Sequence, residues 1–174
     1  MKETHLPFRT AAVLGAGVMG SQIAAHLANS GLTVHLLDVP AKEGNKNAIV
    51  EGAFKKMLKL QPNPLVSKKA TKRITLGNFD EHFDRLSEAE WIIEVVIENL
   101  PIKQQLMERL DKVAREDAII SSNTSGLPIH QITKGRAQAF KKRFLGTHFF
   151  NPPRYLKLLE IIPTPDTDPS ILER

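Results

Sequence analysis

The feature that most constrains the fold of this chain is a glycine-rich hexapeptide between two apolar segments. It reads GAGVMG, in which Gly15, Gly17 and Gly20 have the spacing GxGxxG. The apolar run 11–14 before it predicts a buried parallel strand, and apolar and small residues at helical spacing follow it. A second apolar run, LTVHLLD, ends at Asp38. Strand, glycine turn, helix and strand in this order predict a βαβ unit.

Each glycine has a separate role in binding a dinucleotide pyrophosphate. Gly15 permits the tight turn, Gly17 lets the backbone approach the phosphates, and Gly20 lets helix and strand pack closely. The helix N-terminus offers unpaired N–H groups and a positive dipole. A carboxylate at Asp38 accepts hydrogen bonds from ribose hydroxyls and repels a 2′-phosphate, and no arginine follows it, which favours NAD over NADP. A tight turn without a ligand is the alternative.

The alternation of strands and helices continues along the chain. We expect a helix at about 46–60, a break in QPNPLVS, and strands in RITLGNF and AEWIIEVVIE. DAIISSNTSG predicts a strand and a turn, 128–133 a short helix, and RFLGTHFF and LKLLEII two late strands. This alternation predicts a Rossmann-like, doubly wound, mostly parallel sheet with helices on both faces.

The clearest helix is predicted in PIKQQLMERLDKVARE. Pro101 suits its first turn. Its apolar face is formed by Ile102, Leu106, Leu110 and Val113. Three or four apolar residues at this spacing pack one helix face against a core.

Composition restricts the class of protein. The chain has 174 residues, no cysteine and a formal net charge of +5. The lack of cysteine excludes disulfides, a cysteine nucleophile and thiolate metal ligands. No apolar run is long enough to span a bilayer, and the N-terminus lacks the apolar core of a secretory signal. We expect one cytoplasmic domain with no metal site and no membrane span.

The surplus of positive charge is concentrated in one segment without acids. It contains Lys55, Lys56, Lys59, Lys68, Lys69, Lys72 and Arg73. Such a cluster attracts phosphate groups, and a solvated helix face and loop is the alternative. We expect no nucleic acid partner, because no aromatic residues alternate with these lysines and no nucleic-acid-binding motif is present.

Polar residues lie where the late strands are expected to end. In open α/β sheets, ligands bind beyond the carboxyl ends of the strands. Asn123, Thr124 and Ser125 follow the strand AIIS and would face the cofactor, although a turn made of good turn residues is the alternative. His148 ends the strand RFLGTH at the same edge, and Glu160 can oppose it across two neighbouring strands.

A histidine held by a carboxylate is a suitable base for oxidising an alcohol. The carboxylate fixes the tautomer and supports the protonated ring, so the other nitrogen can take the hydroxyl proton. We therefore expect His148 to be the base, Glu160 its orienting acid, and the Ser125 hydroxyl a donor to the developing carbonyl oxygen. His26, expected on the first helix, and His35, expected in the second strand, have no such acid nearby.

Five segments, taken in order, carry a family resemblance: GAGVMG, IENLPIKQQLMERLDKVA, SSNTSGLPI, HFFNPP and LKLLEIIPTPDT. Together they resemble the NAD-binding domain of the 3-hydroxyacyl-CoA dehydrogenases of fatty-acid β-oxidation, over about residues 9–170. The resemblance implies oxidation of (3S)-3-hydroxyacyl-CoA to 3-oxoacyl-CoA with NAD. It matches His148, Glu160 and Ser125 to the catalytic histidine, its partner acid and the serine near substrate and nicotinamide.

The resemblance also implies which residues contact NAD. Asp38 matches the ribose-binding aspartate, and Glu98, Lys103 and Asn151 match cofactor-contacting positions. The set that we expect at the cofactor is Gly15, Gly17, Val18, Met19, Gly20, Asp38, Val95, Glu98, Lys103, Asn123, Ser125 and Asn151. The basic segment 55–72 falls where the family places contacts with CoA.

The family pattern extends beyond this chain. It includes a helical C-terminal domain that closes the active site, mediates dimerisation and contributes an asparagine. We therefore expect residues 1–174 to be an isolated NAD-binding domain that ends in an interdomain linker, PTPDTDPSILER, with a frayed C-terminus as the alternative. DVPAKEGNKNA resembles the larger bacterial proteins in which this domain precedes an enoyl-CoA hydratase-like module.

Two other functions fit parts of the sequence. A non-catalytic NAD-binding module needs the glycine loop but no His–Glu pair, so the pair counts against it. A related dehydrogenase for small hydroxy acids or sugar nucleotides shares the Rossmann half, but the lysine cluster and HFFNP favour CoA esters. We expect the isolated domain to bind NAD with little turnover, since half of its pocket is missing.

Overall fold

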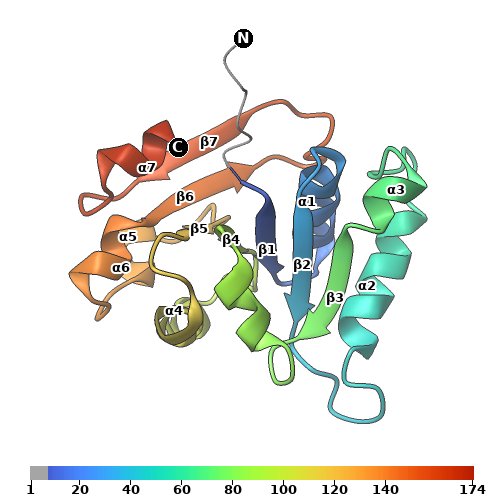
Figure 1. The fold of residues 1–174 in the computed structure, drawn as a ribbon, viewed down its shortest axis with the longest axis horizontal. Helices are drawn as coiled ribbons and strands as arrows, with labels where there is room; N and C mark the ends of the chain where they lie inside the picture. Colours follow the sequence, from blue (N-terminus) through green and yellow to red (C-terminus); the bar gives the residue numbers. More distant parts are fainter. Residues whose placement is uncertain (1–7) are drawn as a thin grey trace.

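The computed structural model describes residues 8–174 and shows a twisted sheet of seven strands (Figure 1). The strands are β1 (Thr10–Leu14), β2 (Thr33–Asp38), β3 (Ile74–Asn78), β4 (Trp91–Glu94), β5 (Ile119–Ser122), β6 (Phe144–Phe149) and β7 (Leu159–Pro163). Their order is β3-β2-β1-β4-β5-β6-β7, and all neighbours are parallel except β6 and β7. The predicted Rossmann-like, mostly parallel sheet is confirmed.

Helices connect the strands on both faces of the sheet. They are α1 (Val18–Asn29), α2 (Ala48–Leu58), α3 (Lys68–Thr71), α4 (Leu100–Val113), α5 (Ile129–Ile132), α6 (Gln138–Lys142) and α7 (Pro169–Glu173), with a 3₁₀ helix η1 (Phe83–Glu88). In Figure 1, α1, α2 and α3 gather beside β2 and β3, and α4 lies near β4 and β5. Within residues 8–174, no helix is both long and apolar enough to cross a membrane.

The two faces of β1 belong to two different apolar clusters. Val13 packs with Ile23 of α1 in one cluster, whereas Leu14 packs with Leu110 of α4 in the other. A strand that is buried on both faces reads as a continuous apolar run rather than an alternating one. This burial explains why the segment before the glycine loop is uniformly apolar.

The first turn of α4 differs from the prediction. Pro101 lies in this turn, and Leu106 and Leu110 are buried, as predicted. Ile102, which we expected in the apolar face, is 40% exposed, and the buried side chain beside it is Lys103, which is 1% exposed. Periodicity misassigns this turn because the acceptors that make burial of an ammonium group possible come from elsewhere in the chain.

The strand predicted in AEWIIEVVIE is shorter than its apolar run. β4 ends at Glu94. The N–H of Val95 still bonds the carbonyl of Leu14 at 2.7 Å, but the N–H of Val96 bonds the side-chain carboxylate of Glu94 at 2.7 Å. The Glu94 side chain thus accepts an N–H that would otherwise bond the neighbouring strand, and the chain leaves the sheet after Val95.

The first and third glycines of the loop allow close backbone approach, at the positions where the sequence predicted a tight turn (Gly15) and close packing of helix and strand (Gly20). Gly15 has φ +102°, a conformation that glycine adopts readily, and a Cβ there would lie 2.6 Å from the carbonyl oxygen of Val95. A Cβ on Gly20 would lie 1.8 Å from the carbonyl oxygen of Gly15. Neither position tolerates a side chain without movement of the backbone.

We predict that Gly20→Ala lowers the free energy of unfolding by about 3 kcal/mol or more, because the new methyl group meets backbone rather than a flexible side chain. The matched control is Gly52→Ala in α2, where a Cβ has no neighbour within 4 Å. This control should gain about 0.5–1 kcal/mol from helix propensity. Urea unfolding followed by circular dichroism measures both, and equal effects of the two variants would contradict the packing argument.

Candidate active site

The predicted site residues gather at one edge of the sheet. Because β1, β4, β5 and β6 are parallel, their carboxyl ends meet there. The glycine loop follows β1, residues 95–98 follow β4, and residues 123–126 follow β5. His148 is the penultimate residue of β6. This edge is where open α/β sheets bind ligands.

Asp38 links the end of β2 to the glycine loop. Its Oδ2 accepts the N–H of Ala16 at 2.7 Å, and its Oδ1 accepts the N–H of Val39 at 2.7 Å. Each carboxylate oxygen has a second acceptor position, so the side chain can still bind ribose hydroxyls. Asp38 therefore holds the loop in place and remains able to bind a ligand.

The N-terminus of α1 fits a dinucleotide pyrophosphate. Gly17 precedes the helix, and a Cβ on it would meet no atom within 4 Å, so the backbone faces open space. Gly17, at the N-cap position, has no side chain that could cap the helix. Val18 is 69% exposed, whereas Met19 packs against the apolar cluster that contains Val13 and Ile23. Uncapped N–H groups and the helix dipole make such a terminus an anion site.

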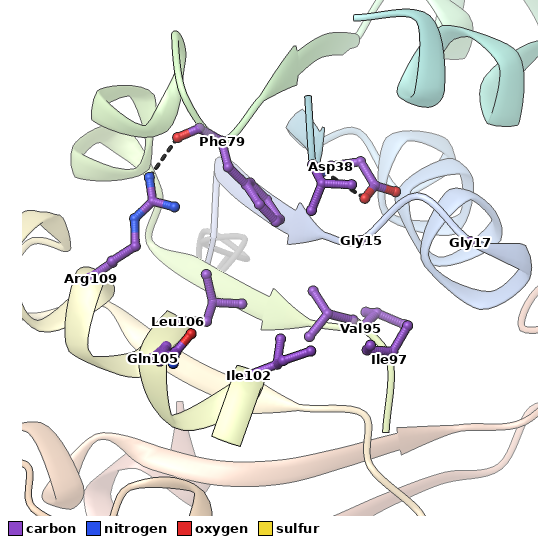
Figure 2. Close-up of a pocket in the computed structure, with 12 residues that line it drawn as sticks. Gly15, Gly17, Asp38, Phe79, Val95, Ile97, Ile102, Gln105, Leu106 and Arg109 are labelled. Carbon is purple, nitrogen blue, oxygen red and sulfur yellow. Dashed lines mark hydrogen bonds between the residues drawn. The ribbon is translucent and has the colours of Figure 1, made fainter. Parts of the chain in front are cut away.

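A cavity of about 490 Å³ lies beside Asp38 and the glycine loop (Figure 2). Phe79 and Asp38 lie on one side of it, and Ile102 and Leu106 lie on the other. Arg109 donates to the carbonyl of Phe79 at 2.6 Å, which fixes one wall. An apolar slot with a carboxylate at one end suits a nucleoside, with the base in the slot and the ribose at the acid.

Sequence reasoning does not identify the walls of this cavity. Phe79 follows β3, while Ile102, Gln105 and Arg109 project from α4. No local motif marks them, since they become neighbours only when the sheet is assembled. In the structure, Ile102 is 40% exposed and lines this cavity instead of the core.

A second cavity, of about 550 Å³, lies between α1 and α2. It shares Gly17 and Asp38 with the first and is lined by apolar side chains such as Ile49 and Leu60. Lys56, a member of the basic segment, also lines it. The segment therefore contributes one cation to an apolar cavity that adjoins the glycine loop.

His148 and Glu160 face each other across β6 and β7. They are paired in the antiparallel register, and His148 Nδ1 lies 2.8 Å from Glu160 Oε2. The His148 side chain is 22% exposed and the Glu160 side chain 49%, so solvent partly reaches both. The expected contact is present, and the catalytic roles of the two residues stay predictions.

The remaining predicted residues differ in what they contact. Asn123 Oδ1 accepts the N–H of Phe149 at 2.8 Å and so joins the ends of β5 and β6. Asn151 Oδ1 accepts from Gln22 of α1 at 3.2 Å. Ser125 is exposed in the turn after β5, the strand beside β6. Within residues 8–174, no group of three or more His, Asp and Glu side chains is arranged to hold a metal.

Glu98 and Lys103 belong to a polar network under this edge. Glu98 accepts the hydroxyl of Thr124 and the N–H of Gly126, and its Oε2 lies 3.3 Å from Lys103 Nζ. Partial burial opposes ionisation of Glu98, but these donors outweigh it and lower its pKa. The Glu98 side chain is 42% exposed and the Lys103 side chain 1%. Glu98 is therefore the member that a ligand can reach.

Comparison with known proteins gives a consistent set of relatives. A family model described as "3-hydroxyacyl-CoA dehydrogenase, NAD binding domain" matches residues 10–174. A Bacillus subtilis protein named "Probable 3-hydroxyacyl-CoA dehydrogenase" is 50% identical over 97% of this chain and 23% of its own length. A protein of the same name from Deinococcus radiodurans is 44% identical over 97% of this chain and 49% of its own length.

Solved structures agree with these relatives. The crystal structure of 3-hydroxybutyryl-CoA dehydrogenase from Escherichia coli superposes with a TM-score of 0.80 at 28% identity, over 97% of this chain and 35% of that chain. The present chain thus spans from about a quarter to half of the length of the curated relatives it matches.

We predict that Gly17→Ala weakens NADH binding by about tenfold or more, because its methyl group occupies the space through which phosphates approach the backbone. The free energy of unfolding should change by less than about 1 kcal/mol, since the methyl group meets no protein atom. Fluorescence titration with NADH and urea unfolding measure the two quantities. Unchanged NADH affinity would show that the phosphates bind elsewhere.

Proposed function

Because this chain belongs to the 3-hydroxyacyl-CoA dehydrogenase family, as its NAD-binding domain, we propose that its parent protein oxidises (3S)-3-hydroxyacyl-CoA to 3-oxoacyl-CoA with NAD, in fatty-acid β-oxidation. The observation that carries this proposal is the 2.8 Å contact between His148 Nδ1 and Glu160 Oε2. It lies at the sheet edge that also holds the glycine loop.

The His–Glu pair supplies the base. Glu160 occupies Nδ1 of His148 and so favours the tautomer in which Nε2 is free to accept the proton of the substrate hydroxyl. When that proton arrives, the ring becomes cationic, and the adjacent carboxylate stabilises it. The Ser125 hydroxyl donates a hydrogen bond to the oxygen that becomes the carbonyl.

The cofactor is held by the backbone of the glycine loop and by the acids beside it. Gly17 and the N-terminus of α1 bind the pyrophosphate, and Asp38 binds the adenosine ribose next to the apolar cavity. Val95, Glu98 and Asn151 lie toward the nicotinamide half. NAD, when bound, supplies the hydride acceptor.

The substrate's CoA portion binds on the α2 side of the glycine loop. The cavity between α1 and α2 combines apolar walls with Lys56. The other basic residues of the segment, such as Lys55 and Lys59, are exposed and raise the local positive potential for CoA phosphates. The same features argue against a substrate that lacks CoA.

The parent protein has further domains. Relatives that are about two to four times longer than the matched region support this proposal. We assign to the parent a helical C-terminal domain that closes the site and mediates dimerisation, and a fused enoyl-CoA hydratase-like module, in a cytoplasmic protein. In residues 8–174 alone, the base and its acid stay partly exposed, which favours NAD binding with little turnover as the activity of the isolated chain.

We predict that His148→Gln in the parent protein lowers kcat for acetoacetyl-CoA reduction by about 10²–10⁴-fold, because the glutamine cannot exchange the proton. The dissociation constant for NADH should change by less than about twofold. His130→Gln is the matched control, since His130 is exposed on α5. Steady-state kinetics and NADH titration provide the two measurements.

Full activity of His148→Gln would exclude His148 as the base. Acetoacetate tested in place of acetoacetyl-CoA separates this function from that of a small hydroxy acid dehydrogenase. Equal kcat/KM for the two compounds would favour the smaller substrate.

We predict that the 174-residue chain binds NADH but reduces acetoacetyl-CoA at least about 10²-fold more slowly than the parent, because solvent reaches the His–Glu pair. Titration and turnover of the same preparation test this. Turnover equal to that of the parent would show that residues 1–174 contain the whole catalytic pocket.

A further inference from the structure

One buried carboxylate has no part in the chemistry described above. Glu94 is the last residue of β4 and is 0% exposed. A buried carboxylate is costly unless it is paired and hydrogen-bonded. Its position directly under the cofactor edge raises the question of what it stabilises.

The Glu94 carboxylate joins three different elements. Its Oε1 accepts Lys103 Nζ of α4 at 2.7 Å and the N–H of Val96 at 2.7 Å. Its Oε2 accepts the Ser122 hydroxyl of β5 at 2.5 Å. Burial raises the pKa of Glu94, while Lys103, Ser122 and Val96 act in the opposite direction by favouring the anion.

The contacts continue outward along two branches to the residues that we place at the cofactor. In one branch, Lys103 Nζ lies 3.3 Å from the Val96 carbonyl oxygen and 3.3 Å from Glu98 Oε2. In the other, Ser122 Oγ accepts the N–H of Thr124 at 3.3 Å. The branches meet where the Thr124 hydroxyl donates to Glu98.

Lys103 depends on Glu94 for its position. An ammonium group has three N–H donors. For Lys103 these donors face Glu94, Val96 and Glu98, and the contact with Glu94 is the shortest at 2.7 Å. Glu98 is exposed and bonds the turn after β5 as well, so it can hold the buried cation only weakly by itself.

We propose that Glu94 is a positioning residue for cofactor binding. It anchors Lys103 and Ser122, and through them it sets Glu98 and the turn 122–126 in the arrangement that receives the nicotinamide half of NAD. The proposal rests on the proposed function, because it takes Glu98 and that turn as part of the NAD site.

The test is Glu94→Gln in the 174-residue chain, with NADH affinity measured by fluorescence titration at a temperature where all variants are folded. Glutamine keeps the shape and can still bond Ser122, but it removes the charge that faces Lys103. The NADH dissociation constant should rise by about tenfold or more.

Ser121→Ala is the matched control for a purely structural effect. Ser121 is 0% exposed in the same strand as Ser122, and its hydroxyl bonds Trp91 Nε1 at 2.9 Å and Thr147 at 2.7 Å. This variant loses buried hydrogen bonds and should unfold at a lower urea concentration. Its NADH dissociation constant should nevertheless equal that of the wild type. If Ser121→Ala loses NADH affinity to the same extent as Glu94→Gln, the effect of Glu94 is only structural and the proposal is overturned.

A double variant tests whether Glu94 acts through Lys103. In Glu94→Gln/Lys103→Met both buried charges are absent, so this protein should fold even if Glu94→Gln alone does not. Its NADH dissociation constant should lie within about twofold of that of Lys103→Met, because the partner of Glu94 is already gone. A further tenfold loss in the double variant, or an unchanged affinity of Glu94→Gln, would overturn the proposal. Failure of the wild type to bind NADH would instead refute the proposed function.

Discussion

The structure depends on the close approach of α1 to the backbone of the glycine loop. A side chain on Gly20 would lie 1.8 Å from the Gly15 carbonyl oxygen, so helix and loop are in direct backbone contact. This contact sets the helix N-terminus at the end of β1 and brings Ala16 within 2.7 Å of the Asp38 carboxylate. The position of the α1 N-terminus beside Asp38 and the two neighbouring cavities follow from that one arrangement.

The direction of the strands decides which residues can act together. Parallel strands bring their carboxyl ends to one edge, so the glycine loop, Glu98 and Ser125 lie at the same edge of the sheet, where we propose that NAD binds. The antiparallel strand β7 adds a second contact to the edge of the sheet. Because β7 returns beside β6, His148 and Glu160 meet at paired positions, and the histidine ring contacts the carboxylate.

Much of this arrangement could be predicted, and the failures have physical causes. The run 11–14 is continuously apolar between turn signals, and α1 has apolar and small residues at helical spacing, so both could be predicted. The short elements α3, α6 and η1 are not predicted, because segments of four to six residues are too short to show a hydrophobic period reliably. The strand predicted in AEWIIEVVIE is too long, since the Glu94 carboxylate, and no sequence signal, ends it.

The sequence by itself determined the βαβ unit, the loop that can bind phosphates, and the pairing of His148 with Glu160, because each depends on local spacing or on one strand register. Only the tertiary structure decided that Lys103 is buried while Ile102 faces a cavity. It also decided that Phe79 and Arg109 line this cavity and that Glu94 contacts Lys103. These residues come from separate strands and helices, and their burial and partners exist only after the layers pack, so no local pattern can encode them in readable form.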